Sequence, residues 1–493
     1  MDEVTNTMKN LPTHMLLLSF SLLTSFAFAD PIQNQIDVLQ QRIDAVETET
    51  NAMRSSLDLL NADSEDVWLT EGRTIQIKSI VHDILADADS RANLLGDGLL
   101  GGWDEGFFIA SSDGRFKLKV GGLMQERYIM NFLRVGLSPA PDAGGGSNDR
   151  WRGGFENTRT RLNISGHIFD RDTTFLIQPG FGWVDPNAFA SGFAGQYQTK
   201  IESRLWDAWV KFKLGDTWSA KAGIFMLPFT RESLVSDARQ LAVDRSLIDY
   251  RLGLARSQGV QFTWAKDNTR AFIALSDGSI TLGGSDTALI NQTPPWSAMG
   301  NDVDWSVTGR AEFLIQGEWE QFNEFTSPPG SQRASMFGIA VHAQNGERGG
   351  SGIPQDQIGL TADFSMNFDG GSFFASGTIH NQENVLGNAG RVPNADWVGY
   401  VLQGSIYTTH TTELFMRLEG GGARQNSVGG DDVHIITSGA NWYLDGQGLK
   451  ITSDFGWSLG EISTQMQNYM VGWRGSDNKN AQWLFRTQLQ LSF

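Results

Sequence analysis

The chain has 493 residues, a formal net charge of −18, 40% hydrophobic residues and no cysteine. The lack of cysteine excludes disulfides, thiolate metal sites and cysteine nucleophiles. No run of about 20 apolar residues is present, which excludes a helical membrane protein but not a β-barrel, whose strands alternate in polarity.

The first residues contain an export signal. Residues 15–28 are apolar but too few to span a membrane, and Ala27-Phe28-Ala29 forms a small-x-small cleavage site before Asp30. The acidic start MDEVTNT does not suit a signal peptide, whereas a start at Met8 places Lys9 at its head. We therefore predict a signal peptide at residues 1–29 with Met8 as the true start; a buried core helix is the alternative.

Residues 30–100 are predicted to form a periplasmic helical stalk. Apolar residues recur at spacings of four and three between residues 32 and 60, the pattern of a coiled coil, with Thr50 as the polar exception. A second helical segment is expected at 71–95 and a glycine-rich linker or turn at 96–102. Residues 30–114 contain 17 acidic and 5 basic side chains and so carry −12 of the net charge of −18, which therefore says little about what the remainder binds. Self-association is the favoured interpretation, and a single amphipathic helix packed on a domain is the alternative.

From residue 115 the hydrophobic period changes to two, which is typical of β-strands. We predict sixteen strands, at 115–133, 155–168, 173–183, 203–214, 217–228, 258–265, 269–276, 305–314, 335–344, 356–368, 371–381, 396–408, 411–420, 432–445, 448–460 and 481–493.

The connections between these strands alternate in length. Tight turns at 170–172, 215–217, 266–269, 369–370 and 445–448 alternate with longer segments at 134–154, 184–202, 229–257, 277–304, 382–395 and 461–480. Outer-membrane barrels have this arrangement, with short periplasmic turns and long external loops. Only the connection 315–334 is longer than its place in the scheme predicts. No motif repeats at a fixed period, which argues against a propeller or solenoid.

The last strand ends on Phe493, with apolar residues two and four positions before it. This ending resembles the recognition signal of the bacterial barrel-assembly machinery. We therefore predict an all-β fold: a transmembrane antiparallel barrel of about 16 strands at residues 105–493, located in the bacterial outer membrane, with an N-terminal coiled-coil extension.

In a barrel surrounded by lipid, the apolar face points outward and the polar face lines water. On this assignment basic residues outnumber acids in the lumen, which predicts anion passage. The candidate pore-lining and anion-binding residues are Lys117, Lys119, Arg127, Arg159, Arg161, Lys211, Lys213, Lys221, Arg239 and Arg245.

The last two candidates belong to the segment 229–257, which we expect to fold inward. Arginine suits such a constriction because its planar fork binds phosphate or carboxylate bidentately. The segment also holds Glu232, Asp237, Asp244 and Asp249, so a salt-bridged plug or a trimer contact is the alternative.

Three stretches resemble the phosphate-selective porin O/P family. They are FKLKVGGLMQERYIMNF at 116–132, ENTRTRLNISGHIFDRDTTFLIQPG at 156–180, and 208–248, where GIFMLPFTRE followed by VDRSL is the most specific part. The resemblance covers about residues 105–493 and implies a trimeric, 16-stranded outer-membrane channel for phosphate or polyphosphate, lined by arginines and lysines. The arginines of that family match Arg159, Arg161, Arg239 and Arg245 loosely.

Other function classes have less support. The seven histidines are scattered, and no metalloprotease, phosphate-cradling or nucleophile-elbow motif occurs, so we predict no enzyme and no cofactor or metal. The expected partners are outer-membrane lipid, small anionic solutes, other copies in a homotrimer and the cell wall through the stalk, but no nucleic acid. A general diffusion porin without anion selectivity and a structural anchor or adhesin are the alternatives.

Overall fold

The computed structural model describes residues 99–104, 106–133, 151–183, 201–279, 303–346, 356–387, 390–424, 432–463, 466, 468, 471–474 and 481–493, with side chains described except at 182–183, 201–204 and 384–394. No helix in this part of the chain has the length and apolar character that crossing a membrane requires. The signal peptide and the coiled-coil stalk lie outside the described residues and stay predictions.

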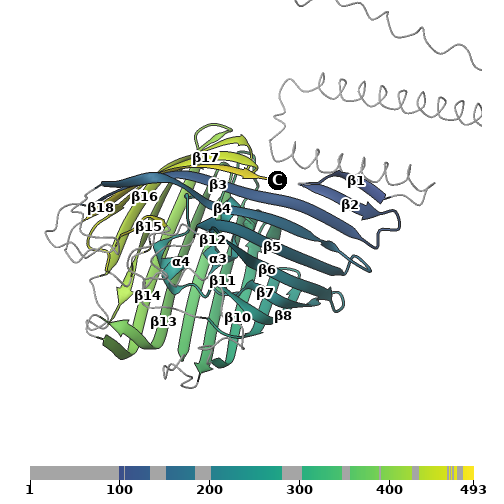
Figure 1. Ribbon diagram of the computed structural model, residues 1–493, viewed down its shortest axis with the longest axis horizontal. Coiled ribbons are helices and arrows are strands. Elements are labelled where there is room, and N and C mark those ends of the chain that lie inside the picture. Colours follow the sequence, from purple (N-terminus) through teal and green to yellow (C-terminus); the bar gives the residue numbers. More distant parts are fainter. Residues whose placement is uncertain are drawn as a thin grey trace, which may run out of the picture. The chain divides into compact units, whose positions relative to one another are not determined.

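Sixteen strands of the described chain form one closed antiparallel barrel (Figure 1). Each strand pairs with the next along the chain, and β18 pairs back to β3, which closes the ring. The strands are β3 (Lys117–Leu133), β4 (Trp151–His167), β5 (Thr173–Trp183), β6 (Ile201–Lys213), β7 (Trp218–Met226), β8 (Arg256–Lys266), β9 (Thr269–Ser276), β10 (Val303–Gln316), β11 (Ala334–Gly346), β12 (Gln357–Phe368), β13 (Gly371–Gly387), β14 (Gly390–Tyr407), β15 (Thr412–Ala423), β16 (Val433–Asp445), β17 (Leu449–Ser458) and β18 (Gln482–Ser492). The predicted 16-stranded barrel is confirmed.

A further hairpin, β1 (Leu99–Trp103) and β2 (Phe107–Ser111), precedes the barrel. Strand β2 pairs with β3 over Lys117–Val120, just beyond the point where β18 ends against β3. The predicted linker at 96–102 is therefore wrong from Leu99 onward. Its glycines suggested a turn, but Gly101 and Gly102 lie in the ladder opposite Ile109 and Phe108.

The alternation of short and long connections is confirmed, with one correction. Strands β13 and β14 continue as a long hairpin whose register extends to Gly387 opposite Gly390, so the predicted loop at 382–395 is wrong. Its polar residues suggested a loop, but strands of a barrel can continue past the lipid into water, where polar residues are favourable. The connection between β10 and β11 is long, as predicted, and includes the short helix η4 (Trp319–Phe322).

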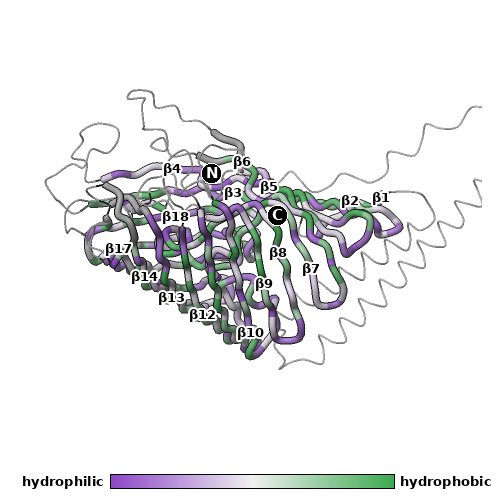
Figure 2. The backbone as a smooth tube through the Cα atoms, turned by 90° about the horizontal axis from the view of Figure 1, so that it is seen from below, coloured by the Kyte–Doolittle hydropathy of each residue, from purple (hydrophilic) through white to green (hydrophobic). Residues whose placement is uncertain are grey.

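The burial pattern is the inverse of that in a soluble protein. In β18, Gln482, Arg486 and Gln490 are at most 2% exposed, whereas Trp483 and Leu489 are 48% and 45% exposed. Hydrophilic and hydrophobic residues alternate along the strands in Figure 2. An outer surface this apolar is stable only in a nonpolar solvent, so the exposed face of the strands is the face that lipid covers.

The connection between β7 and β8, residues 227–255, lies inside the barrel. It includes α3 (Arg231–Leu234), η2 (Asp237–Arg239) and α4 (Leu247–Leu252). Apolar residues of α4 pack with Trp397, Val433 and Ile435 of the wall in one buried cluster. A Cβ on Gly399 would lie 2.6 Å from Cγ2 of Ile248, so the close approach of α4 to β14 requires a glycine there.

We expect Ile379→Arg to destabilise the barrel. Ile379 is 54% exposed on the outer face of β13, opposite Leu360 of β12. A charge on the lipid face costs on the order of 2 kcal/mol, depending on depth. Equilibrium urea unfolding in lipid vesicles measures this cost, with Ile379→Val as the control. Equal stability of the two variants would show that this face does not contact lipid.

Candidate functional site

The inward segment 227–255 is held to the barrel wall by its carboxylates. Asp244 contacts three guanidinium groups, those of Arg127 on β3, Arg159 on β4 (2.7 Å) and Arg486 on β18 (3.4 Å). All four side chains are nearly inaccessible to solvent. Because a buried charge is costly unless it is paired, this cluster fixes the segment against the β18–β3–β4 wall.

A second carboxylate, Asp237, extends the network. Its oxygens lie 2.5 Å from Nη1 of Arg161, 2.7 Å from Nη1 of Arg245 and 3.7 Å from Nε of Arg159. Three candidates on the wall, Arg127, Arg159 and Arg161, thus have their charges engaged by carboxylates of the segment, and the candidate Arg245 pairs with Asp237 within the segment. They form the salt-bridged arrangement that the sequence left open as an alternative.

The pKa values of the acids reflect this pairing. Burial alone would raise the pKa of Asp244, but Arg159, Arg127 and Arg486 more than offset it and lower the pKa. The pKa of Asp237 is held well below its usual value because Arg161, Arg245 and Arg159 likewise outweigh the effect of burial.

Glu232 behaves differently. Burial and the nearby Asp249 raise the pKa of Glu232 from 4.5 to about 7, although Arg417 and hydrogen bonds from Ser246 act in the opposite direction. The nearest guanidinium nitrogen of Arg417 is 3.5 Å from Glu232, a distant contact for an ion pair. Glu232 and its neighbour Asp249 are therefore acids of this network whose pKa values burial raises rather than lowers.

Polar side chains of the far wall bind the backbone of the segment. Gln490 donates to the carbonyl of Ala238 (2.9 Å), Lys450 to that of Gln240 (3.1 Å) and Asn441 to that of Leu241 (3.0 Å). The segment therefore leaves the barrel wall at β7, crosses the lumen to β16–β18 and returns at β8. One side of the lumen is filled by these contacts.

The remaining candidates lie elsewhere on the wall. Lys117 pairs with Asp104 (2.7 Å), and Lys119 lies opposite Phe108 in the β2–β3 ladder. Lys211 and Lys221 are direct cross-strand partners on β6 and β7. Lys213, near the short turn after β6, is exposed and 4.0 Å from Asp172.

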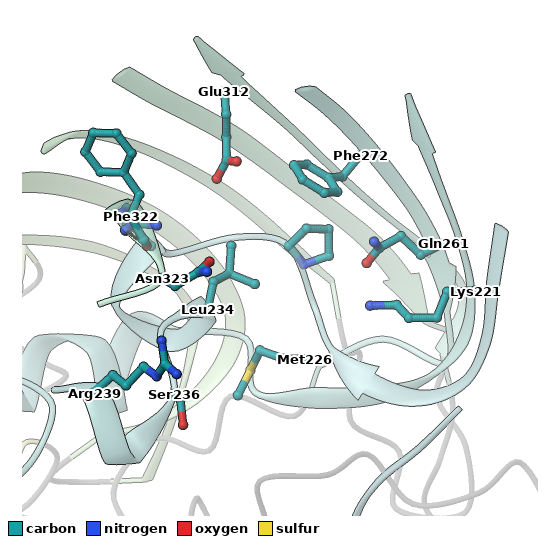
Figure 3. A pocket seen from close by; sticks show the side chains of 12 residues that line it. Lys221, Met226, Leu234, Ser236, Arg239, Gln261, Phe272, Glu312, Phe322 and Asn323 are labelled. Atoms are coloured by element: carbon teal, nitrogen blue, oxygen red, sulfur yellow. Dashed lines mark hydrogen bonds between the residues drawn. The ribbon is translucent and has the colours of Figure 1, made fainter. Parts of the chain in front are cut away.

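A cavity of about 460 Å³ remains between the segment and the β7–β10 wall (Figure 3). It is lined by Lys221, Met226, Pro228, Arg231, Leu234, Ser236, Arg239, Gln261, Phe272, Glu312, Phe322 and Asn323. In the described part of the chain, neither Lys221 nor Arg239 has an ion-pair partner. Glu312 is already paired with Arg310 (2.8 Å), so the cavity is basic overall.

Lys221 and Arg239 of this lining are among the anion-binding candidates predicted from the sequence. Phe272 is not, although this residue lies on the inward face of β9, between Ile273 and Ala271 in a strand whose other face is apolar. Phe322 and Asn323 are not either, and the excess length of the connection after β10 was the available signal for them.

The family model of phosphate-selective porin O and P matches residues 144–327, which confirms the resemblance over this part of the chain. No curated protein matches the sequence. Among solved structures, the anion-selective porin from Comamonas acidovorans is similar, with 12% identity, a TM-score of 0.48 and coverage of 76% of this chain and 99% of that chain. The outer membrane channel DcaP of Acinetobacter baumannii and the OmpF of Salmonella typhi in complex with daunomycin each have 12% identity and a TM-score of 0.47, with coverage of 80% of this chain and 100% of theirs.

The inverted barrel and the family match over residues 144–327 together support an outer-membrane channel.

Docking of the inward segment should strengthen as the pH falls from 8 to 5.5. Glu232 has a higher pKa when docked (about 7) than when free (4.5), so the docked state binds more protons and gains stability as the pH falls through 7. Asp237 and Asp244, whose pKa values are lowered, remain ionised, and their contribution is lost only below about pH 4. Current fluctuations in planar bilayers should therefore become rarer at pH 5.5, and Glu232→Gln should reduce this dependence, leaving the part that is due to the raised pKa of Asp249. A wild-type channel that becomes noisier on this acidification would contradict the assignment.

Proposed function

We propose that the protein is an outer-membrane channel through which small anions diffuse passively along the β7–β10 side of the lumen. The observation that carries the proposal is the basic cavity beside the docked segment, with Lys221 and Arg239 unpaired among the described residues.

The charge distribution in the lumen supports this route. The wall arginines on β3, β4 and β18 have strong fields of their own, but Asp237 and Asp244 neutralise them. On β6 and β7, Lys211 lies directly opposite Lys221, and the nearby Asp207 is paired with Arg256 (2.9 Å). Low-dielectric walls focus the field of such charges into the open path, which favours anions over cations.

The position of these lysines suits conduction as well as selection. Lys211 and Lys221 adjoin on one face of the β6–β7 hairpin, and Lys221 lines the cavity. Each ammonium is a compact, hydrated charge that offers an anion a weak site rather than a deep trap. A series of weak sites lets an ion enter and also leave, which conduction requires.

Two alternatives are supported by particular contacts. The inward acids Glu312, Asp363 and Asp454 are each paired with an arginine of the wall. If such neutral pairs determine the electric field in the lumen, the protein is a general diffusion pore without anion selectivity. The many contacts between the segment 227–255 and the far wall favour a plugged barrel that acts as an anchor or adhesin. Phosphate itself is suggested only by the name of the matching family.

For the whole protein we propose a homotrimer in the bacterial outer membrane. Export by the signal peptide at 1–29 and assembly through the periplasmic stalk at 30–100 are part of this proposal, as is contact of the stalk with the cell wall. The barrel at 105–493 would then place its short turns on the periplasmic side, where the stalk begins.

Neutralising Lys221 and Arg239 should weaken anion selectivity. We expect Lys221→Gln with Arg239→Gln to lower the anion-to-cation permeability ratio at least about twofold, because the nearest acids, Asp207 and Glu312, are already paired with Arg256 and Arg310. The ratio is obtained from reversal potentials under a KCl gradient in planar bilayers.

The matched control is Lys213→Gln, since this lysine is exposed and close to Asp172. It should change the ratio less than the double variant does. A wild-type channel that prefers cations would contradict anion passage, and a correctly folded wild-type protein without current would contradict the channel itself.

A further inference from the structure

The cavity beside Lys221 and Arg239 is not a purely polar site. Five of its lining residues are apolar, namely Met226, Pro228, Leu234, Phe272 and Phe322. Elsewhere the inward face of the strands is mainly polar, as in β12, where Gln357, Thr361, Asp363, Ser365 and Asn367 are buried. Met226, Leu234 and Phe272 are only partly buried, although they face the water side of the barrel. Apolar side chains grouped in a concave site of this kind are typical of an organic ligand site.

The charged and apolar parts of the site are arranged side by side. Lys221 lies directly opposite Gln261 in the β7–β8 ladder, and Phe272 comes from β9, the next strand. In Figure 3 the side chains of Lys221, Gln261 and Phe272 come from adjacent strands of the wall, and Leu234 of the inward segment faces them. An anion bound to Lys221 would therefore have an aromatic ring and a leucine beside it.

The long connection 317–333 enters the barrel from the short-turn rim and contributes Phe322 and Asn323 to the lining of the cavity. Its Phe325 donates a backbone hydrogen bond to the carbonyl of Arg239 (3.3 Å), and Arg231 donates to the carbonyl of Phe322. Asn367 of β12 donates to the carbonyl of Gln321 (2.8 Å). These contacts join the two inward segments and place Phe322 and Asn323 in the lining of the cavity.

The volume of the cavity exceeds the needs of an inorganic ion. A single phosphate occupies roughly the volume of two to three water molecules, or about 60–90 Å³. The cavity of about 460 Å³ lies instead within the range of small-molecule sites. A phosphate would leave Phe272 and Leu234 in contact with water, whereas an organic body would cover them.

We propose that this cavity binds organic carboxylates that have an apolar body, in preference to inorganic phosphate. The carboxylate contacts Lys221 and Gln261, and the apolar body packs against Phe272, Leu234 and Met226. The proposal rests on the proposed function, because the ligand reaches the cavity only through an open channel. It gives the apolar lining and the long connection 317–333 a role in solute selection.

The test compares three probes as blockers of chloride current through the purified full-length channel in planar bilayers. Benzoate has a carboxylate and an aromatic body, acetate has the carboxylate without that body, and inorganic phosphate has neither a carboxylate nor an apolar part. We expect benzoate to halve the current at a concentration about tenfold lower than either acetate or phosphate, the ratio that 1.4 kcal/mol of additional binding gives.

Variants of one residue separate ring contact from charge. Phe272→Ser should raise the half-blocking concentration of benzoate about tenfold and leave those of acetate and phosphate unchanged, whereas Phe272→Leu should retain most of the benzoate block. The shift of the folded band on heating in gel electrophoresis checks that both variants are folded.

Three outcomes would overturn the proposal. Phosphate could block at a lower concentration than benzoate, acetate could match benzoate, or folded Phe272→Ser could keep the wild-type benzoate block. The comparison of probes on the wild-type channel decides the question even if the serine variant does not fold. A wild-type channel without any current would instead overturn the proposed function and this inference with it.

Discussion

The pairing of carboxylates in the segment 227–255 with arginines of the barrel wall is the interaction on which the interior depends. Buried guanidinium groups on β3, β4 and β18 would be strongly unfavourable alone. Asp237 and Asp244 supply the missing charges, and their lowered pKa values show that the arginines outweigh the cost of burial. The segment is therefore part of the electrostatic balance of the barrel, and removing it would leave several cations unpaired.

This pairing makes the lumen asymmetric. The side formed by β15–β18 and β3–β4 is filled by the segment, which also packs its apolar residues against Trp397 and Ile435. The opposite side, along β6–β10, keeps a cavity and two cations without ion-pair partners among the described residues. Arg127, Arg159 and Arg161, which the sequence predicts as anion-binding residues, thus stabilise the fold. Lys221 and Arg239 remain available to contact the solute.

Much of the barrel could be predicted because its physical causes are local. Alternation with a period of two, tight turns and a terminal aromatic residue can each be recognised within a short stretch of sequence. The outward apolar face of the strands is unfavourable in water, so it must contact lipid. The hairpin β1–β2 and the extension of β13–β14 were missed because glycines and polar residues, which usually end strands, lie within them. The pairing of Arg127 with Asp244 had no local signal, since it joins residues more than a hundred positions apart. The cavity could not be predicted because three separate parts of the chain form its lining: the wall strands, the segment 227–255 and the connection 317–333. Only the unusual length of that connection was visible in the sequence.

The most direct test of this account is the single-channel conductance of Asp244→Asn, measured beside the wild type in planar bilayers. Loss of this charge leaves Arg127, Arg159 and Arg486 with less compensation, so the segment should detach from the wall. The variant should have a larger conductance because the segment 227–255 no longer obstructs the lumen. It should also prefer anions more strongly than the wild type does because a negative charge is removed. A folded variant with the conductance and selectivity of the wild type would contradict the claim that this carboxylate holds the segment in place.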